Sequence, residues 1–157
     1  MHGTKALQLK PHSDEQQEIL QKAKQYCEQT GNRFTPSREK IYKLLLQADG
    51  SIGAYDLLDK LKQTDSKAKP PTVYRALDFF LHVGLAHKVE STNTFKACRH
   101  FDCAHPVQFL ICDYCGDVRE IQSKGIRDTL EAQAKQHEFK IKTQTIEAHG
   151  ICQRCQS

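Results

Sequence analysis

Apolar residues recur at helical spacing through the first half of the chain, in segments separated by turn residues. The first of these helices follows a possible capping box at Ser13–Gln16. The second begins at Thr35-Pro36, a capping residue followed by a proline in the first turn, and is expected to end at Gly50. The pattern predicts helices at about residues 13–31, 35–50, 54–63 and 71–83.

The fourth of these helices carries the most informative pattern. Its apolar positions fall on one face, which leaves Thr72, Tyr74 and Arg75 off that face. Two short strand patterns, at 85–90 and 94–98, then flank a polar turn and predict a hairpin. Short helices followed by a hairpin are typical of a winged helix-turn-helix, whose second motif helix enters the DNA major groove. Tyr74 and Arg75 would then face bases or phosphates.

The pattern changes after Arg99. Residues 100–106 are polar and turn-like, as expected of a hinge. Beyond them the sequence predicts strands at 107–112 and 118–121, a helix at 123–137 and an edge-type strand at 139–148. We therefore expect an α+β chain with domains at 1–99 and 100–157. The second is so small that it needs a metal, a disulfide or a partner chain.

Composition narrows the class of protein without naming a function. The chain has 157 residues, 38% of them hydrophobic and 27% charged, which is ordinary globular usage. It has no transmembrane-length apolar run and no secretory pattern, so we expect a cytoplasmic protein without a membrane partner. The net charge of +4 is modest, but positive residues concentrate at 33–43 and 60–75. These stretches fit either a nucleic-acid face or solvated helix surfaces.

Cysteine spacing points to metal. Six of the seven cysteines lie in the last 60 residues, and in a reducing compartment they are read as thiolates or ligands. Two CxxC knuckles supply four thiolates, enough for a closed, tetrahedral and therefore structural zinc site. The alternatives are two separate dithiols or a thioredoxin-like redox pair. The knuckle ligands are Cys112, Cys115, Cys152 and Cys155.

A second ligand set would draw on both halves of the chain. His87 and Cys98 should lie almost opposite each other on the hairpin, His105 lies on the hinge, and Glu120 on a C-terminal strand. A thiolate with imidazoles and a carboxylate favours Zn²⁺. Taken singly, each residue could instead be an ordinary surface or hydrogen-bonded group. Two further alternatives are a zinc hydrolase, disfavoured because Cys98 closes the site, and a thiol redox switch through Cys98 and Cys103.

Four sequence blocks are long enough to be specific: Ala54–Leu58, Lys69–Phe79, His87–Asn93 and Ile146–Cys152. They resemble the ferric uptake regulator family, and within it the zinc-sensing branch, and the resemblance covers about Cys27 to Cys155. It implies a homodimeric, zinc-dependent transcriptional repressor of zinc uptake genes, not an enzyme and without a small-molecule substrate. It also implies a winged-helix domain that binds double-stranded operator DNA and a small α/β dimerisation domain that holds a structural zinc.

The resemblance also implies roles for individual residues, with two zinc ions per subunit. The two CxxC pairs would hold the structural zinc, and His87, Cys98, His105 and Glu120 the regulatory one. Tyr55, Thr72, Tyr74 and Arg75 would contact DNA. Asp59 and Lys62 would contact a neighbouring dimer on DNA, or form an ordinary i, i+3 ion pair.

Two features of the hinge depart from the family pattern. It is one residue shorter than expected, and it carries His100 and Cys103 as rival ligands. The alternative function is an iron-responsive or thiol-redox regulator of the same family, and Cys98 disfavours the iron-responsive one.

Overall fold

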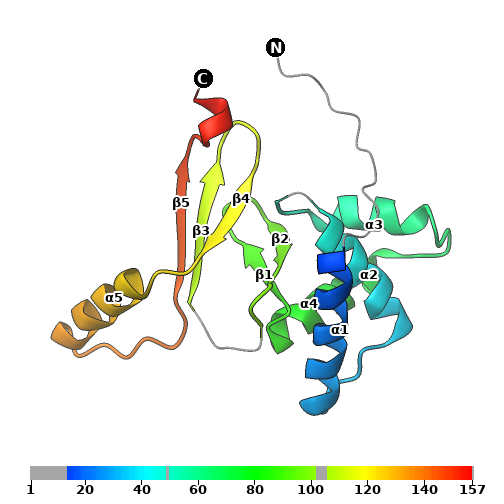
Figure 1. Cartoon of the computed structure of the whole chain (residues 1–157), viewed down its shortest axis with the longest axis horizontal. Coiled ribbons are helices and arrows are strands. Elements are labelled where there is room, and N and C mark those ends of the chain that lie inside the picture. The colour runs from blue at the N-terminus through cyan, green and yellow to red at the C-terminus, as the bar shows by residue number, and fades with distance from the viewer. Residues whose placement is uncertain (1–13, 49, 102–105, 157) are drawn as a thin grey trace.

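The computed structural model describes residues 14–48, 50–101 and 106–156. Figure 1 shows helices α1 to α4 on one side, the sheet of β3, β4 and β5 on the other, and the β1–β2 hairpin between them. The fold is α+β, as predicted. The helices are α1 (Asp14–Gln29), α2 (Pro36–Gln47), α3 (Ala54–Lys62), α4 (Pro70–Val83) and α5 (Lys124–Gln136). The other elements are β1 (Ala86–Val89), β2 (Thr94–Ala97), β3 (Val107–Cys112), β4 (Val118–Ile121), β5 (Thr145–Gly150) and the 3₁₀ helix η1 (Gln153–Cys155).

Local sequence signals set the ends of the N-terminal helices. The Thr35 side chain accepts a hydrogen bond from the Arg38 N–H and caps α2, as the sequence predicted. Gly84 ends α4 with φ of 83°, a left-handed conformation that favours glycine. The predicted capping box of α1 includes Ser13, which lies outside the described residues.

The end predicted for α2 is wrong. The helix ends at Gln47, before Gly50. Gly50 instead lets two segments approach closely, because a Cβ atom there would lie 3.3 Å from the Val118 nitrogen. Its φ of 80° is a second reason for glycine at this position.

The hairpin pairs in a register two residues away from the one expected. His87 lies opposite Lys96, and the Cys98 N–H donates to the Leu85 carbonyl at 2.9 Å. The prediction that His87 and Cys98 lie nearly opposite each other is therefore wrong. Because a shift of two residues preserves the face of a strand, the two side chains remain diagonal neighbours on one face.

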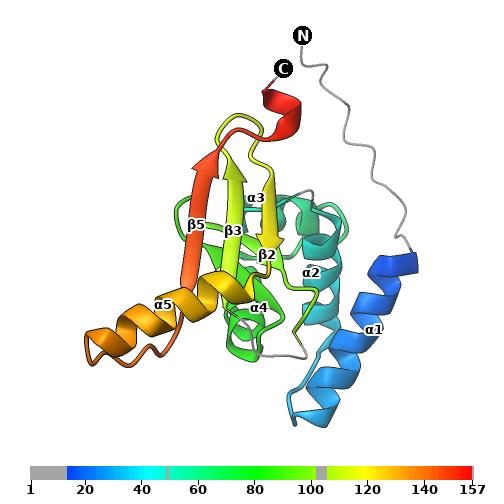
Figure 2. The same ribbon diagram turned by 60° about the vertical axis from the view of Figure 1, so that its left-hand side comes forward.

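The C-terminal sheet has the strand order β4-β3-β5, with β4 antiparallel and β5 parallel to β3. The strand predicted from Phe139 begins only at Thr145, which pairs with Val107 at the start of β3. The Val107 N–H donates to the Gln144 carbonyl at 3.1 Å, so the pairing of the two strands starts at this point. Figure 2 shows α5 crossing near one end of the strands.

The hairpin joins the two halves by packing. Val89 at the end of β1 is fully buried against Phe109, Ile111 and Val118 of the C-terminal sheet. The larger core cluster lies among α1 to α4 and includes residues of both hairpin strands. The two-domain division at residue 99 stays a prediction. Within the described ranges, no helix combines the length and the apolar character needed to cross a membrane.

Candidate metal centres and nucleic-acid interface

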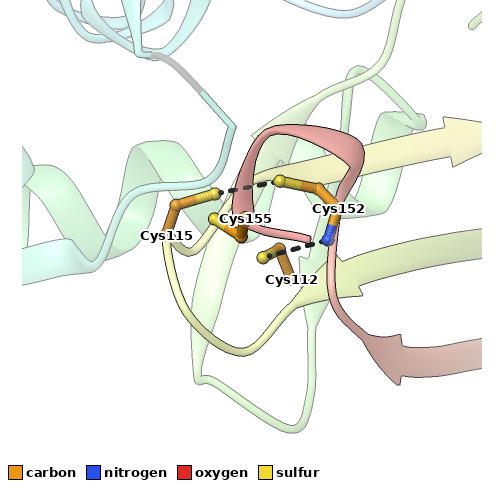
Figure 3. Close-up of side chains that lie close together, drawn as sticks. All are labelled: Cys112, Cys115, Cys152 and Cys155. Carbon is orange, nitrogen blue, oxygen red and sulfur yellow. Dashed lines mark hydrogen bonds between the residues drawn. The ribbon is translucent and has the colours of Figure 1, made fainter. Parts of the chain in front are cut away.

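The two CxxC knuckles meet at one end of the C-terminal sheet. Figure 3 shows Cys112, at the end of β3, and Cys115, in the β3–β4 connection, turned toward Cys152 and Cys155 at η1. The four sulfur atoms all lie within 4.8 Å of one another. Gly116 turns the first knuckle with φ of 74°. Residues 40 positions apart in sequence are thus brought to one point, because β5 runs parallel to β3 and ends beside it.

The spacing of these thiols fits a tetrahedral zinc ion. Four sulfurs at about 2.3 Å from one centre lie about 3.8 Å from each other. The Sγ atoms of Cys115 and Cys152 are 3.7 Å apart. Two separate dithiols would not require this distance between the knuckles, so the geometry favours one four-thiolate site.

Hydrogen bonds around the cluster prepare one thiol to ionise. The Cys152 N–H donates to the Cys112 sulfur at 3.4 Å and lowers the pKa of Cys112 to about 6. The side-chain hydrogen bond with Cys152 instead raises the pKa of Cys155 to about 12. Crowded thiols therefore resist complete ionisation by themselves, and a dication among them is the group that this donor set suits.

A second cluster lies where the hairpin meets the sheet. His87 comes from β1, Cys98 follows β2, and Glu120 belongs to β4. Their ligand atoms lie within 4.8 Å of one another, with His87 Nε2 at 3.6 Å from Glu120 Oε1. The Cys98 residue is 0% exposed, and the side chains of His87 and Glu120 are 15% and 10% exposed. The structure thus brings together three of the four predicted ligands.

His105, the fourth predicted ligand, lies outside the described residues, as does Cys103. His100 is described, and its backbone N–H donates to the Cys98 sulfur at 3.4 Å. The His87 ring also contacts Phe109, with ring centroids 6.4 Å apart. A soft thiol, an imidazole and a carboxylate in such a sheltered place form a set that suits zinc.

The predicted DNA-contacting residues lie on the helix-turn-helix surface. Tyr55 on α3 is 73% exposed and Tyr74 on α4 is 44% exposed. Arg75 is exposed beside Tyr74, and Thr72 is partly buried near the start of α4. The opposite face of α4 is buried through Val73, Ala76, Leu77 and Phe80. The roles of Tyr55, Thr72, Tyr74 and Arg75 in DNA binding stay predictions.

Asp59 and Lys62 are both exposed on α3. Both lie in the described part of the chain, and no ion pair joins them there. The alternative of an ordinary i, i+3 pair therefore finds no support, and the side chains are available to another molecule.

The helix α5 leaves an apolar surface open. Ile126 and Leu130 are 38% and 40% exposed, and Phe139 beyond the helix is 66% exposed. A groove of about 720 Å³ runs between α5 and residues 139–145. Exposed apolar patches of this kind mark interaction surfaces.

Sequence reasoning missed a polar contact between the halves. Glu147 on β5 accepts hydrogen bonds from the backbone N–H groups of Glu90 and Ser91 at the hairpin turn. A hydrogen bond with the Ser91 side chain contributes most to lowering the pKa of Glu147, and the backbone hydrogen bonds from Ser91 and Glu90 lower it further. Only the block Ile146–Cys152 flagged this region, and no local pattern predicts a contact across 57 positions.

Comparison with known proteins decides the family. Residues 29–155 match the Ferric uptake regulator family. The zinc uptake regulation protein of Escherichia coli (strain K12) is 46% identical over 140 residues, which cover 88% of this chain and 82% of that protein. The chain belongs to the ferric uptake regulator family. Because this is a family of transcription regulators, its membership confirms that the protein is not an enzyme.

Solved structures of family members agree with the fold. A zinc uptake regulator in complex with zinc and DNA matches with a TM-score of 0.86 and 44% identity, over 91% of this chain and 95% of that chain. This similarity also confirms the expected winged-helix and dimerisation-domain architecture.

Two structures of another family member differ in how well they match. Holo XcZur gives a TM-score of 0.80 at 39% identity, over 88% of this chain and 97% of that chain. Apo XcZur gives a TM-score of 0.55 at 37% identity, over 92% of this chain and 100% of that chain. Since the identities are nearly equal, the difference reflects the arrangement of the chain. The present structure is therefore more similar to the holo structure than to the apo structure of that protein.

Proposed function

We propose that this chain is a zinc-dependent repressor that binds operator DNA as a homodimer and controls zinc uptake genes. One observation carries the proposal: His87 and Cys98 from the hairpin meet Glu120 from the C-terminal sheet. Ligands drawn from both halves are close together only when the halves are held in one orientation. The names of the similar proteins, which include a zinc- and DNA-bound regulator, support this choice of metal and target.

Each subunit would hold two zinc ions in different roles. Cys112, Cys115, Cys152 and Cys155 would form the closed structural site. His87, Cys98 and Glu120, together with His105, would form the regulatory site. Zinc, when bound, supplies a dication that compensates the thiolate and carboxylate charges. The thiolate of Cys98 favours zinc over iron.

The residues of the chain would convert site occupancy into DNA binding. His87 and Cys98 fix the hairpin, which is packed beside the helix-turn-helix, and Glu120 fixes the sheet. A fixed orientation sets the separation of the two recognition helices in a dimer, which must match the spacing of operator half-sites. The ligands would favour this orientation by about 1–3 kcal/mol.

The contact surfaces follow from the same arrangement. Tyr55, Thr72, Tyr74 and Arg75 would contact operator DNA from α3 and α4. The apolar surface of α5 and Phe139 would pack against a second copy. Asp59 and Lys62 would contact a neighbouring dimer. Because operator DNA is its target, the protein would act in the cytoplasm.

The test is a gel-shift titration against buffered free zinc, using an inverted-repeat operator selected from a randomised duplex pool. Metal content is measured at both ends of the titration. We expect operator binding to rise with zinc as each subunit gains a second ion. Binding that is independent of zinc, or that responds better to ferrous iron, would contradict the proposal.

A further inference from the structure

The turn of the hairpin rests on the C-terminal sheet through a carboxylate that is not in either ligand set. Glu147 Oε1 accepts a hydrogen bond from the Glu90 N–H at 2.8 Å, and Glu147 Oε2 lies 3.3 Å from the Ser91 nitrogen. The Glu147 side chain is only 14% exposed. Hydrogen bonds from backbone N–H groups to a carboxylate are stronger than those between neutral groups.

The Glu147 carboxylate also contacts His149, which lies two positions further along β5. His149 Nε2 lies 3.6 Å from Glu147 Oε2, and His149 Nδ1 lies 3.1 Å from Asp113 Oδ1. Asp113 belongs to the first cysteine knuckle. A chain of polar contacts therefore runs from the knuckle, through β5, to the hairpin turn.

Apolar packing holds the same end of the hairpin. Val89, next to Glu90, is fully buried against Phe109, Ile111 and Val118. His87 lies two positions before Val89 on β1. Fixing the turn therefore also fixes where His87 lies relative to Glu120.

We infer that Glu147 is a positioning residue that docks the hairpin turn onto the sheet and so assembles the regulatory ligand set before metal binds. This inference rests on the proposed function. The carboxylate and the ligands each join the same two halves, so both favour the same arrangement. When the competent arrangement is less populated, the apparent affinity for its ligand falls in proportion.

The test uses the full-length protein with Glu147→Ala, which removes the acceptor, and Glu147→Gln, which keeps one acceptor oxygen without the charge. Glu131→Ala is the control, because Glu131 is an exposed acid on α5. The readout is operator gel shift against buffered free zinc. Circular dichroism and bound zinc at low free zinc verify that the fold and the structural site are intact.

We expect Glu147→Ala to need about tenfold more free zinc for half-maximal operator binding, in line with the loss of hydrogen bonds to a charged group. Glu147→Gln should show a smaller shift, and Glu131→Ala none. All variants should reach the wild-type plateau at saturating zinc, which a general loss of structure would not allow.

Two results would overturn the inference alone. In the first, the zinc curve of Glu147→Ala coincides with that of the wild type. In the second, the plateau falls while the midpoint stays in place. If the wild-type protein itself binds operator without regard to zinc, the proposed function fails together with the inference.

Discussion

The four-cysteine cluster and the His87–Cys98–Glu120 cluster differ in where their ligands come from. The cysteines all belong to the C-terminal half and meet beside the parallel pair β3 and β5. The second cluster takes two residues from the hairpin region and one from the sheet. Binding at the first would stabilise one half, whereas binding at the second would orient two halves. In the proposed function, the origin of the ligands therefore distinguishes the structural metal from the sensing metal.

We expect the largest effect from a substitution that tests the structural role of the four-cysteine cluster. Cys155→Ser would remove one of four ligands from the proposed structural site, where binding energy is also folding energy, on the order of 10–16 kcal/mol in small zinc domains. We expect loss of the structural zinc and unfolding of the C-terminal half, measured by metal analysis and circular dichroism melting. Gln153→Ala, in the same turn, is the control. A native melt for Cys155→Ser would rule out the structural role.

The second-largest effect should come from a substitution that removes zinc sensing and leaves the structural site intact. Cys98→Ala should keep the fold, the dimer and one zinc per subunit, yet lose zinc-dependent operator binding worth about 1–3 kcal/mol. Size-exclusion chromatography, metal analysis and gel shift measure these properties. Cys27→Ala is the matched control, since Cys27 is equally buried but belongs to α1. Full zinc-dependent binding by Cys98→Ala would remove this residue from the site.

Arg75→Ala separates DNA contact from metal sensing. If Arg75 reads a base, operator affinity should fall by about 1–3 kcal/mol and specificity at one position should relax. The zinc affinity measured in the absence of DNA should not change, because Arg75 lies on α4 outside both clusters. Lys135→Ala, which removes a charge from α5, controls for charge. An equal loss on all DNA sequences would make Arg75 a phosphate contact instead.

The smallest effect concerns contact between dimers. Asp59→Ala or Lys62→Ala should weaken cooperative binding to an operator with two dimer sites by about 0.2–1 kcal/mol, as for an exposed ion pair. Binding to a single-dimer site should stay unchanged. Sedimentation of protein–DNA complexes distinguishes one bound dimer from two. Unchanged cooperativity in both variants would show that Asp59 and Lys62 make no contact with a neighbouring dimer.

Local patterns predicted the elements of the fold better than their pairing. Three features depend only on neighbouring residues and could therefore be predicted from the sequence: the Thr35 cap, the end of α4 at Gly84 and the buried face of α4. The hairpin register depends on which turn residues close it, and Asn93 adopts a left-handed φ of 53° that the strand pattern does not encode. The start of β5 likewise depends on a partner strand.

The candidate sites show the same limit. Cysteine spacing within each knuckle is local, and the pairing of two knuckles follows from zinc chemistry. The second cluster could be anticipated because alternation kept His87 and Cys98 on one face even in the wrong register. The Glu147 contact could not, since it depends on how the hairpin packs on the sheet.

In the proposed function, metal at the joint and operator DNA favour the same arrangement of the two halves. Linkage then requires each to strengthen binding of the other by one factor. The most direct test is the zinc affinity of the second site, measured by chelator competition with and without saturating operator. We expect zinc to bind more tightly in the presence of operator, by the same factor with which zinc tightens operator binding. An affinity that operator leaves unchanged would contradict it.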